Sequence, residues 1–266
     1  MIKYIQNLIL FSVFLTSCIS DGERSTALVN VFVIDAPGDF DEVWVEILGV
    51  EVTTIGTRGQ DNADPVFFEN LQSNQQVNLS SLILDRQFLV GRGELLVGAI
   101  TELTLKLGTD HYVVIDGARI PLEIENIEDQ NPSLTVNYPL DAGISYDIFI
   151  DFEVFRSISS QPNPANGFVL KPKLRSFSRA DTGEIAGSIL PVMENAIIYA
   201  IQGKDTVSST AVDVSTGRFK LRGILGSHTV VILPFNTKYL PETIPNVNVE
   251  SRKITQISAV TLRPKP

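Results

Sequence analysis

Carboxylates are the side chains that could do chemistry in the greatest number here. The 266-residue chain carries 31 Asp and Glu residues against 21 Lys and Arg. Asp151 and Glu153 lie two apart in a strand-like segment, which puts their Cβ atoms about 6.5–7 Å apart on one face. That separation falls within the range of inverting glycosidase carboxylates. A catalytic pair must flank its substrate from different directions, so we interpret these two as structural or surface groups.

The histidines and the cysteine restrict the other kinds of catalysis. His111 and His228 fall in different predicted domains, and Cys18 is the only cysteine. Zinc clusters need several such ligands together, and a cysteine–histidine dyad needs a free thiol near a base. The Gly-x-Ser-x-Gly, His-Glu-x-x-His and Walker patterns are absent. We therefore predict no catalytic residues and no cofactor. A carboxylate-based hydrolase at the cell surface, for example a glycosidase, is the alternative.

One acidic turn could hold a metal ion. Asp35, Asp39, Asp41 and Glu42 lie within eight residues of one another, and Ca²⁺ prefers such oxygen ligands. The spacing and the glycine of an EF-hand are missing. Because Asp35 precedes an Ala-Pro pair, a turn cap with solvated neighbours is the simpler interpretation. Asp35, Asp39 and Asp41 remain candidates for calcium, and we predict no other metal site.

Trp44 is the only tryptophan and the one candidate for ligand binding. It alternates with Val43 and Val45, so it projects from the opposite face of its strand. There it could stack on a sugar, or it could pack under a loop or against a second sheet. Sugar-binding modules usually bring several aromatic side chains to one surface, and no second one is readable beside Trp44.

The first residues have the features of an export signal. Lys3 precedes a short apolar run, Leu8–Leu15, and Leu15-Thr16-Ser17-Cys18 resembles a lipobox. The run is too short to span a membrane, which takes about 20 residues. We predict a signal peptide over 1–17, a lipid, including palmitate, on Cys18, and a tether over 18–26. The protein would then be a lipoprotein of the bacterial outer membrane, on its periplasmic or its outer side.

The charge distribution narrows the class of partner. The formal net charge is −10, and it is uneven along the chain. Residues 18–179 hold 11 Lys and Arg against 24 Asp and Glu, whereas residues 180–266 hold 9 against 7. An acidic body does not suit nucleic acid, whose phosphates need basic side chains. We expect contact with the membrane through the lipid, and a protein or glycan as the further partner.

Apolar residues alternate with polar ones along most of the chain. This period of two is typical of strands with one buried face. Every second residue from Val43 to Ile47 is apolar, and after Gly49 the apolar phase moves to Val50 and Val52. A phase shift at a glycine inside a strand indicates a β-bulge. The one stretch with a helical pattern is Asn78–Leu89.

The pattern restarts after a polar segment near residue 180. About seven further strands follow, which is the size of a small sandwich. We therefore predict an all-β protein with two consecutive β-sandwich domains, at 27–178 and 180–266, after the signal peptide.

Several segments carry resemblances to known families. Residues 29–176 resemble bacterial lipoproteins with a domain of unknown function numbered 4382, a family without an established activity. The segments that carry it are Val33–Val45, Val114–Gly117, Ile148–Glu153 with Arg156–Ile158, and Leu170–Arg175. The second domain resembles the carboxypeptidase regulatory-like sandwich, through Gly187–Ile189, Ala196–Ala200, Gly217–Leu221 and Gly226–Val230. The second resemblance implies a spacer or interaction module without peptidase activity.

Overall fold

The computed structural model describes residues 25–35, 40–56, 65–160 and 167–266. Across these residues nearly all regular structure is β, with short helical turns between strands. The predicted all-β class is confirmed. Cys18, the signal peptide and Asp39 lie outside the described residues, as does the side chain of Asp35.

The first sandwich consists of two sheets. One has four strands in the order β13 (Leu174–Ser178), β10 (Ser145–Phe152), β1 (Thr26–Asp35) and β5 (Phe88–Leu96). In the described chain the other has the path β11 (Ile158–Ser160), β12 (Phe168–Leu170), β8 (Ala118–Glu123), β7 (Tyr112–Ile115), β2 (Glu42–Gly56), β6 (Gly98–Leu107) and β9 (Ser133–Leu140). β3 (Val66–Glu69) and β4 (Gln76–Asn78) also pair with β2. A short helix, α2 (Val154–Ser157), follows β10.

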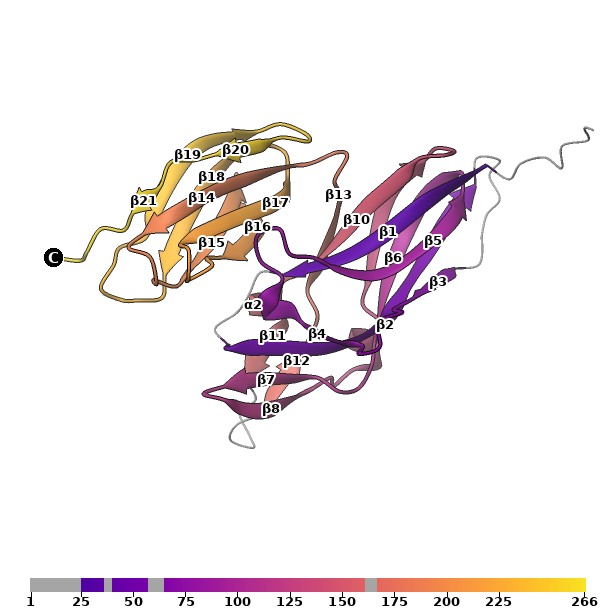
Figure 1. Ribbon diagram of the computed structural model, residues 1–266, viewed down its shortest axis with the longest axis horizontal. Coiled ribbons are helices and arrows are strands. Elements are labelled where there is room, and N and C mark those ends of the chain that lie inside the picture. The colour runs from indigo at the N-terminus through magenta and orange to yellow at the C-terminus, as the bar shows by residue number, and fades with distance from the viewer. Residues whose placement is uncertain (1–24, 36–39, 57–64, 161–166) are drawn as a thin grey trace, which may run out of the picture.

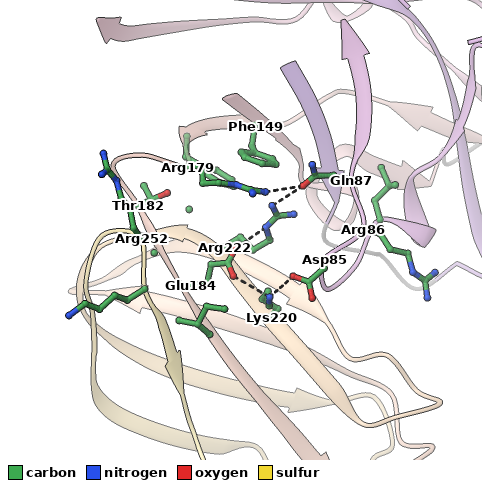
Figure 2. A pocket seen from close by; sticks show the side chains of 16 residues that line it. Asp85, Arg86, Gln87, Phe149, Arg179, Thr182, Glu184, Lys220, Arg222 and Arg252 are labelled. Atoms are coloured by element: carbon green, nitrogen blue, oxygen red, sulfur yellow. Dashed lines mark hydrogen bonds and ion pairs between the residues drawn. The ribbon is translucent and has the colours of Figure 1, made fainter. Parts of the chain in front are cut away.

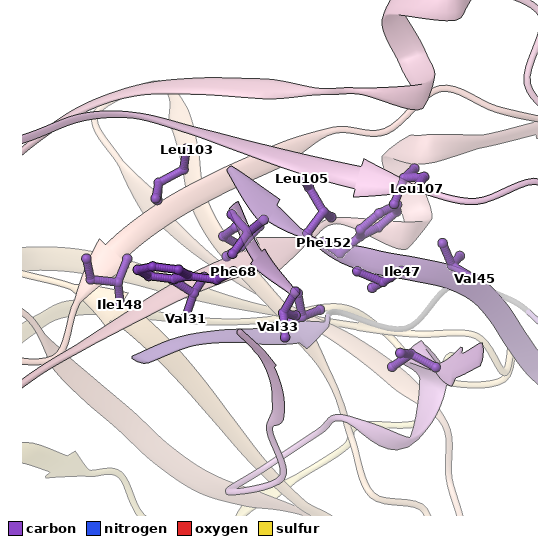
Figure 3. Close-up of a cluster of buried hydrophobic side chains, with 14 of the residues drawn as sticks. Val31, Val33, Val45, Ile47, Phe68, Leu103, Leu105, Leu107, Ile148 and Phe152 are labelled. Atoms are coloured by element: carbon purple, nitrogen blue, oxygen red, sulfur yellow. The ribbon is translucent and has the colours of Figure 1, made fainter. Parts of the chain in front are cut away.

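The core of this sandwich comes from one face of each sheet. Val31 and Val33 of β1 and Ile148 of β10 are fully buried, and Figure 3 shows them opposite Leu103 and Leu105 of β6. Alternation places these side chains because successive residues of a strand point to opposite faces. The alternating apolar residues of β10, Ile148, Ile150 and Phe152, therefore belong to the core.

The predicted bulge lies in β2. Ile47 pairs with Leu107 and Gly49 with Lys106, so Leu48 is the extra residue. Val50 and the valines before Ile47 remain in the same core, which confirms the phase shift. A Cβ at Gly49 would overlap the Phe68 carbonyl on β3, so the glycine lets the two strands approach.

The predicted helix over Asn78–Leu89 is wrong. Only one 3-10 turn forms there, Leu79–Ser81, before the chain continues irregularly to β5. Leu79 and Leu82 turn inward to the core, and Leu84 has φ +59°, a left-handed conformation that a helix cannot contain. Burial of the two leucines, with contacts of the next residues to the second sandwich, outweighs the local helical pattern.

The second sandwich has two sheets and a core of its own. One sheet has the order β17 (Arg218–Ile224), β14 (Gly183–Leu190) and β20 (Ile254–Gln256), with β21 (Val260–Thr261) also on β14. The other has the order β16 (Asp205–Ala211), β15 (Ala196–Gln202), β18 (Gly226–Pro234) and β19 (Glu242–Val249). Ile185, Ile198, Phe219 and Val230 are among the buried residues of a hydrophobic cluster separate from the first core.

The two sandwiches lie side by side, joined by the chain after β13 (Figure 1). The outer face of the sheet formed by β13, β10, β1 and β5 contacts the second sandwich. Phe149 alternates with the core residues of β10 and so points away from the first core, yet it is fully buried. Phe149 forms a small cluster with Ile34 and Phe177, against which Phe32 packs. Both faces of β10 are thus covered.

Candidate functional site: a cationic cleft between the sandwiches

A cleft of about 870 Å³ lies between the two sandwiches. The segment before β5 and the strands β10 and β13 form one wall, and β14, β17 and the β19–β20 connection form the other (Figure 2). The charged residues that line it are Asp85, Arg86, Arg179, Glu184, Lys220, Arg222, Arg252 and Lys253. Six of these eight are basic, although the whole chain is acidic. A cleft of this size can hold a small ligand.

Two guanidinium groups converge on one neutral oxygen in this cleft. Arg179, at the end of the first sandwich, and Arg222, on β17, each donate a hydrogen bond of 3.3 Å to Oε1 of Gln87 (Figure 2). Arg222 is 5% exposed, and its Nη1 is buried without a hydrogen-bond partner among the described residues. Burial lowers the pKa of Arg222; Glu184 opposes that shift, and the positive charge of Arg179 adds to it.

Phe149 holds both guanidinium groups in place. The Cζ atom of Arg222 lies 4.5 Å from the centre of its ring, and that of Arg179 lies 5.2 Å away. The ring also stacks between Phe32 and Phe177, with centroid separations of 5.4 and 5.0 Å. Cations are attracted to aromatic faces, so the two arginines are fixed by a rigid aromatic base.

Acidic groups neutralise part of the positive charge of the cleft, around Lys220 and Arg222. Glu184 lies 3.3 Å from Nε of Arg222 and 3.2 Å from Nζ of Lys220. Lys220 also bonds to Asp85, and this bond, with the charge of Lys220, holds the pKa of Asp85 below its usual value. Figure 2 shows one continuous chain of contacts from Arg179 through Gln87 and Glu184 to Asp85. The carboxylates thus lie on the Lys220 side, away from Arg179.

Asp151 belongs to the contact between the sandwiches. It is 2% exposed and lies 2.6 Å from Nη2 of Arg175, its partner across β10 and β13. Arg175 also donates to Ser208 and to the carbonyl groups of Arg222 and Gly223 in the second sandwich. Burial raises the pKa of Asp151, while the charge and hydrogen bond of Arg175 act in the opposite direction.

The expected placement of Glu153 is only partly right. β10 ends at Phe152, so Glu153 does not share the strand face of Asp151. It precedes α2 and accepts a 2.7 Å bond from Arg156 instead. Phe155, two residues further on, is exposed on α2. The Glu153 amide still bonds to the Lys173 carbonyl at 2.9 Å, and the chain then turns into the helix.

Trp44 has an aromatic neighbour in the structure. The register of β2 and β7 pairs it with Tyr112, and the rings stack with centroids 5.9 Å apart. The guanidinium of Arg119 covers Tyr112 at 3.7 Å from its ring centre. Trp44 Nε1 donates to Glu42 at 2.6 Å. Sequence spacing could not reveal this stack, because the register across strands decides it.

The acidic turn is described only in part. The Asp41 carboxylate accepts a hydrogen bond of 2.8 Å from the amide of Asp116, and the Glu42 carboxylate accepts one from Trp44. Among the described residues no group of three or more His, Cys, Asp or Glu side chains is placed to hold a metal ion. Asp39, which lies outside those residues, leaves the calcium prediction untested.

Both histidines are buried and bonded to the backbone. His111 accepts the Glu46 amide at Nδ1, at 3.2 Å, and its Nε2 lies 3.2 Å from the carbonyl of Gly108. His228 contacts the carbonyl of Leu225 through Nε2 at 3.1 Å. Burial lowers the pKa of both rings. His111, directly before β7, and His228, in β18, thus act as structural groups.

Sequence reasoning missed the cleft itself. Arg179, Arg222 and Arg252 are scattered along the chain, and only the packing of the sandwiches brings them together. The one signal was the change of charge balance near residue 180, which marks where basic residues become more frequent. Within the part of the chain that is described, no helix is long and apolar enough to cross a membrane.

Several solved structures of bacterial proteins show some likeness to the chain. The TIE protein of Bacillus anthracis is 10% identical with a TM-score of 0.21; the match covers 90% of this chain and 34% of that one. The fimbrial anchor protein of Porphyromonas gingivalis is 12% identical with a TM-score of 0.24, covering 88% and 90% of the two chains. A shaft pilin of Lactobacillus rhamnosus GG is 9% identical with a TM-score of 0.19, covering 91% and 98%. Scores this low carry no inference about function.

Family assignment rests on the sequence of the first sandwich. None of the curated proteins matches the chain. The profile of the domain of unknown function DUF4382 matches residues 26–172, which is more than half of the chain and ends just before β13. The chain therefore belongs to the DUF4382 family.

Proposed function

We propose that this protein is a non-catalytic module, anchored to the bacterial outer membrane by a lipid on Cys18, which binds or supports a partner outside the membrane. The observation that carries the proposal is how the reactive side chains are used. Asp151, Arg175, Glu184 and Lys220 are engaged with one another or with backbone groups where the sandwiches meet. Such contacts hold two domains in a fixed orientation, which suits a structural or binding role.

Lipid anchoring is supported by the lipobox-like sequence that ends at Cys18. The test compares wild type with Cys18→Ser, expressed with the complete N-terminus in a bacterial host. Wild type should partition into the detergent phase and incorporate labelled palmitate, and Cys18→Ser should do neither. A Cys18→Ser protein that loses its signal and still partitions with detergent would refute anchoring through Cys18. Protease treatment of intact cells would distinguish the outer side from the periplasmic side.

The second sandwich is proposed to be a carboxypeptidase regulatory-like module, with the boundary near residue 180. Its support is the sequence resemblance together with the eight strands, β14 to β21, which surround a separate core in the described chain. In this proposal the module acts as a spacer, and contributes one wall of the cleft.

A glycan is the more specific form of the proposed partner, with Trp44 as its candidate contact. The stack of Trp44, Tyr112 and Arg119 supplies aromatic surface on one sheet, although the rings already cover each other in part. Because Trp44 is the only tryptophan, its fluorescence reports this site alone. A titration with neutral oligosaccharides should shift the emission of wild type and leave Tyr112→Ala less responsive. An unchanged spectrum at saturating sugar would remove the glycan from the proposal.

The hydrolase alternative needs two free catalytic carboxylates, and its two best candidates are both held in ion pairs. Asp151 is paired with Arg175, and Glu153 with Arg156. We expect no glycosidase or esterase activity from the purified protein. An activity that is lost in Asp151→Asn, while the fold is retained, would overturn the non-catalytic proposal.

A further inference from the structure

We propose that the cleft between the sandwiches binds a small oxyanion with at least two negative groups, phosphate or carboxylate, on the guanidinium groups of Arg179 and Arg222. The inference deepens the binding role proposed above by naming a ligand class. The proposed anion site does not depend on lipid anchoring, which is tested separately by partition into the detergent phase.

Two cations converge on a neutral atom in the cleft. Arg179 and Arg222 both donate to Oε1 of Gln87, at 3.3 Å each. The two positive guanidinium groups repel each other when both lie next to one oxygen atom. The amide oxygen carries only a partial negative charge to offset this repulsion. A phosphate or carboxylate oxygen would accept the same hydrogen bonds with a full negative charge, and such bonds are about twice as strong. Gln87 thus marks the position of an anionic oxygen.

The buried guanidinium group of Arg222 also has a hydrogen-bond donor that is unused within the described part of the chain. Nη1 of Arg222 has no hydrogen-bond partner in the described structure, and the residue is 5% exposed. Leaving a buried charged donor unsatisfied is costly. Glu184 contacts Nε of Arg222, on the side shared with Lys220. A small shift of the Gln87 side chain would let one anion engage Arg179 and Arg222 together.

Arg252 adds further positive charge at the rim of the cleft. Arg252 is exposed and forms no ion pair within the described residues; its Nε donates to the carbonyl of Ala180. The ion pair of Arg179 with Asp147 is long, at 4.0 Å. With a volume of about 870 Å³, the cleft can accommodate a ligand whose second anionic group reaches Arg252. A ligand with a single charge would leave that group unused.

Calorimetric titration of the full chain, in mild detergent and at constant ionic strength, tests the proposal. The probes are inorganic pyrophosphate, citrate and, as a neutral control, glucose. Calorimetry is preferred to melting curves because phosphate and citrate stabilise most folded proteins by exclusion from their surfaces. We expect one site for pyrophosphate or citrate and none for glucose. The tighter probe indicates a phosphate or a carboxylate ligand, and either result supports the site. No heat with either anion at millimolar concentration would overturn it.

Three variants locate the site. Arg179→Gln removes one charged donor from an exposed side chain and should weaken binding about ten- to hundredfold. Gln87→Glu puts a carboxylate where the anion oxygen would lie, so it should abolish binding and raise the melting temperature. Arg263→Gln, outside the cleft and in an exposed pair with Glu242, removes the same charge and should leave binding unchanged. Equal weakening by Arg263→Gln and Arg179→Gln, or full binding by a folded Gln87→Glu protein, would overturn the proposal.

Discussion

Asp151 and Arg175 lie directly opposite each other on β10 and β13, with carboxylate and guanidinium 2.6 Å apart, in a contact that both sandwiches share. Arg175 also donates to the carbonyl groups of Arg222 and Gly223 and to the hydroxyl of Ser208. The ion pair within the first sandwich therefore orients the Arg175 side chain, and this side chain in turn binds the second sandwich.

Breaking the pair from its two sides should have unequal effects. Arg175→Met leaves the Asp151 carboxylate buried without a cation and should lower the free energy of unfolding by about 3–5 kcal/mol. Asp151→Asn keeps an oxygen that can accept from Arg175 and should lower it by about 1–3 kcal/mol. Denaturant unfolding measures both. Glu125→Gln, in the exposed pair with Lys171, is the control and should change stability by less than about 1 kcal/mol. Equal losses in all three variants would contradict the shared role of the pair.

Gly223 should be sensitive to a single methyl group. Its φ is +68°, and a Cβ there would overlap the ring of Phe177 across the contact. Gly203 has a similar φ of +64° but open space around the position. Gly203→Ala should therefore show only the backbone strain, about 1–2 kcal/mol. Gly223→Ala should lose about 1–3 kcal/mol more through overpacking. Thermal unfolding of the two variants measures the difference, and equal melting temperatures would show that Phe177 yields without loss.

The first sandwich should fold as residues 27–178 alone, but less stably than the full chain. Its core lies between its own two sheets, which predicts a cooperative transition. Phe149 and Phe177, however, would lose the cover of the second sandwich. We expect the fragment to bind a hydrophobic dye that the full chain does not bind, and to melt at a lower temperature. Aggregation or a broad, non-cooperative melt would contradict the boundary near residue 180.

Both histidines should make the fold less stable in mild acid. Burial holds the pKa of His111 and His228 below the ordinary value, so the unfolded chain takes up protons before the folded one. This contribution is complete above the unfolded pKa, about 6.5, and is lost as pH falls toward the lower folded values. The largest effect is about 1.4 kcal/mol per pH unit for each histidine.

His111→Gln supplies the comparison, because Gln stays neutral across this range. Unfolding free energies between about pH 5 and 7.5 should fall less steeply for His111→Gln than for wild type. The window stops above the range in which most carboxylates take up protons. A wild-type stability that stays flat or rises on acidification would show that the rings are not held neutral by burial.

Local sequence was sufficient to predict the strands and the bulge. Alternation reports which face of a strand is buried, and this depends only on neighbouring residues. The shift from Ile47 to Val50 across Gly49 therefore located the bulge that the structure shows. The helical pattern over Asn78–Leu89 failed because burial of Leu79 and Leu82 outweighs a weak local preference.

Relationships between distant segments could not be predicted in this way. The stack of Trp44 on Tyr112 depends on the pairing of β2 with β7, and the pair of Asp151 and Arg175 on the register of β10 with β13. Predicting the cleft would also require the packing of the two sandwiches, because Arg179 and Arg222 meet only where the two separate cores pack together. Side-chain alternation sets the face of each residue, whereas strand register and domain packing select its neighbours. Those choices follow from the summed burial of whole sheets, which no short segment of the sequence contains.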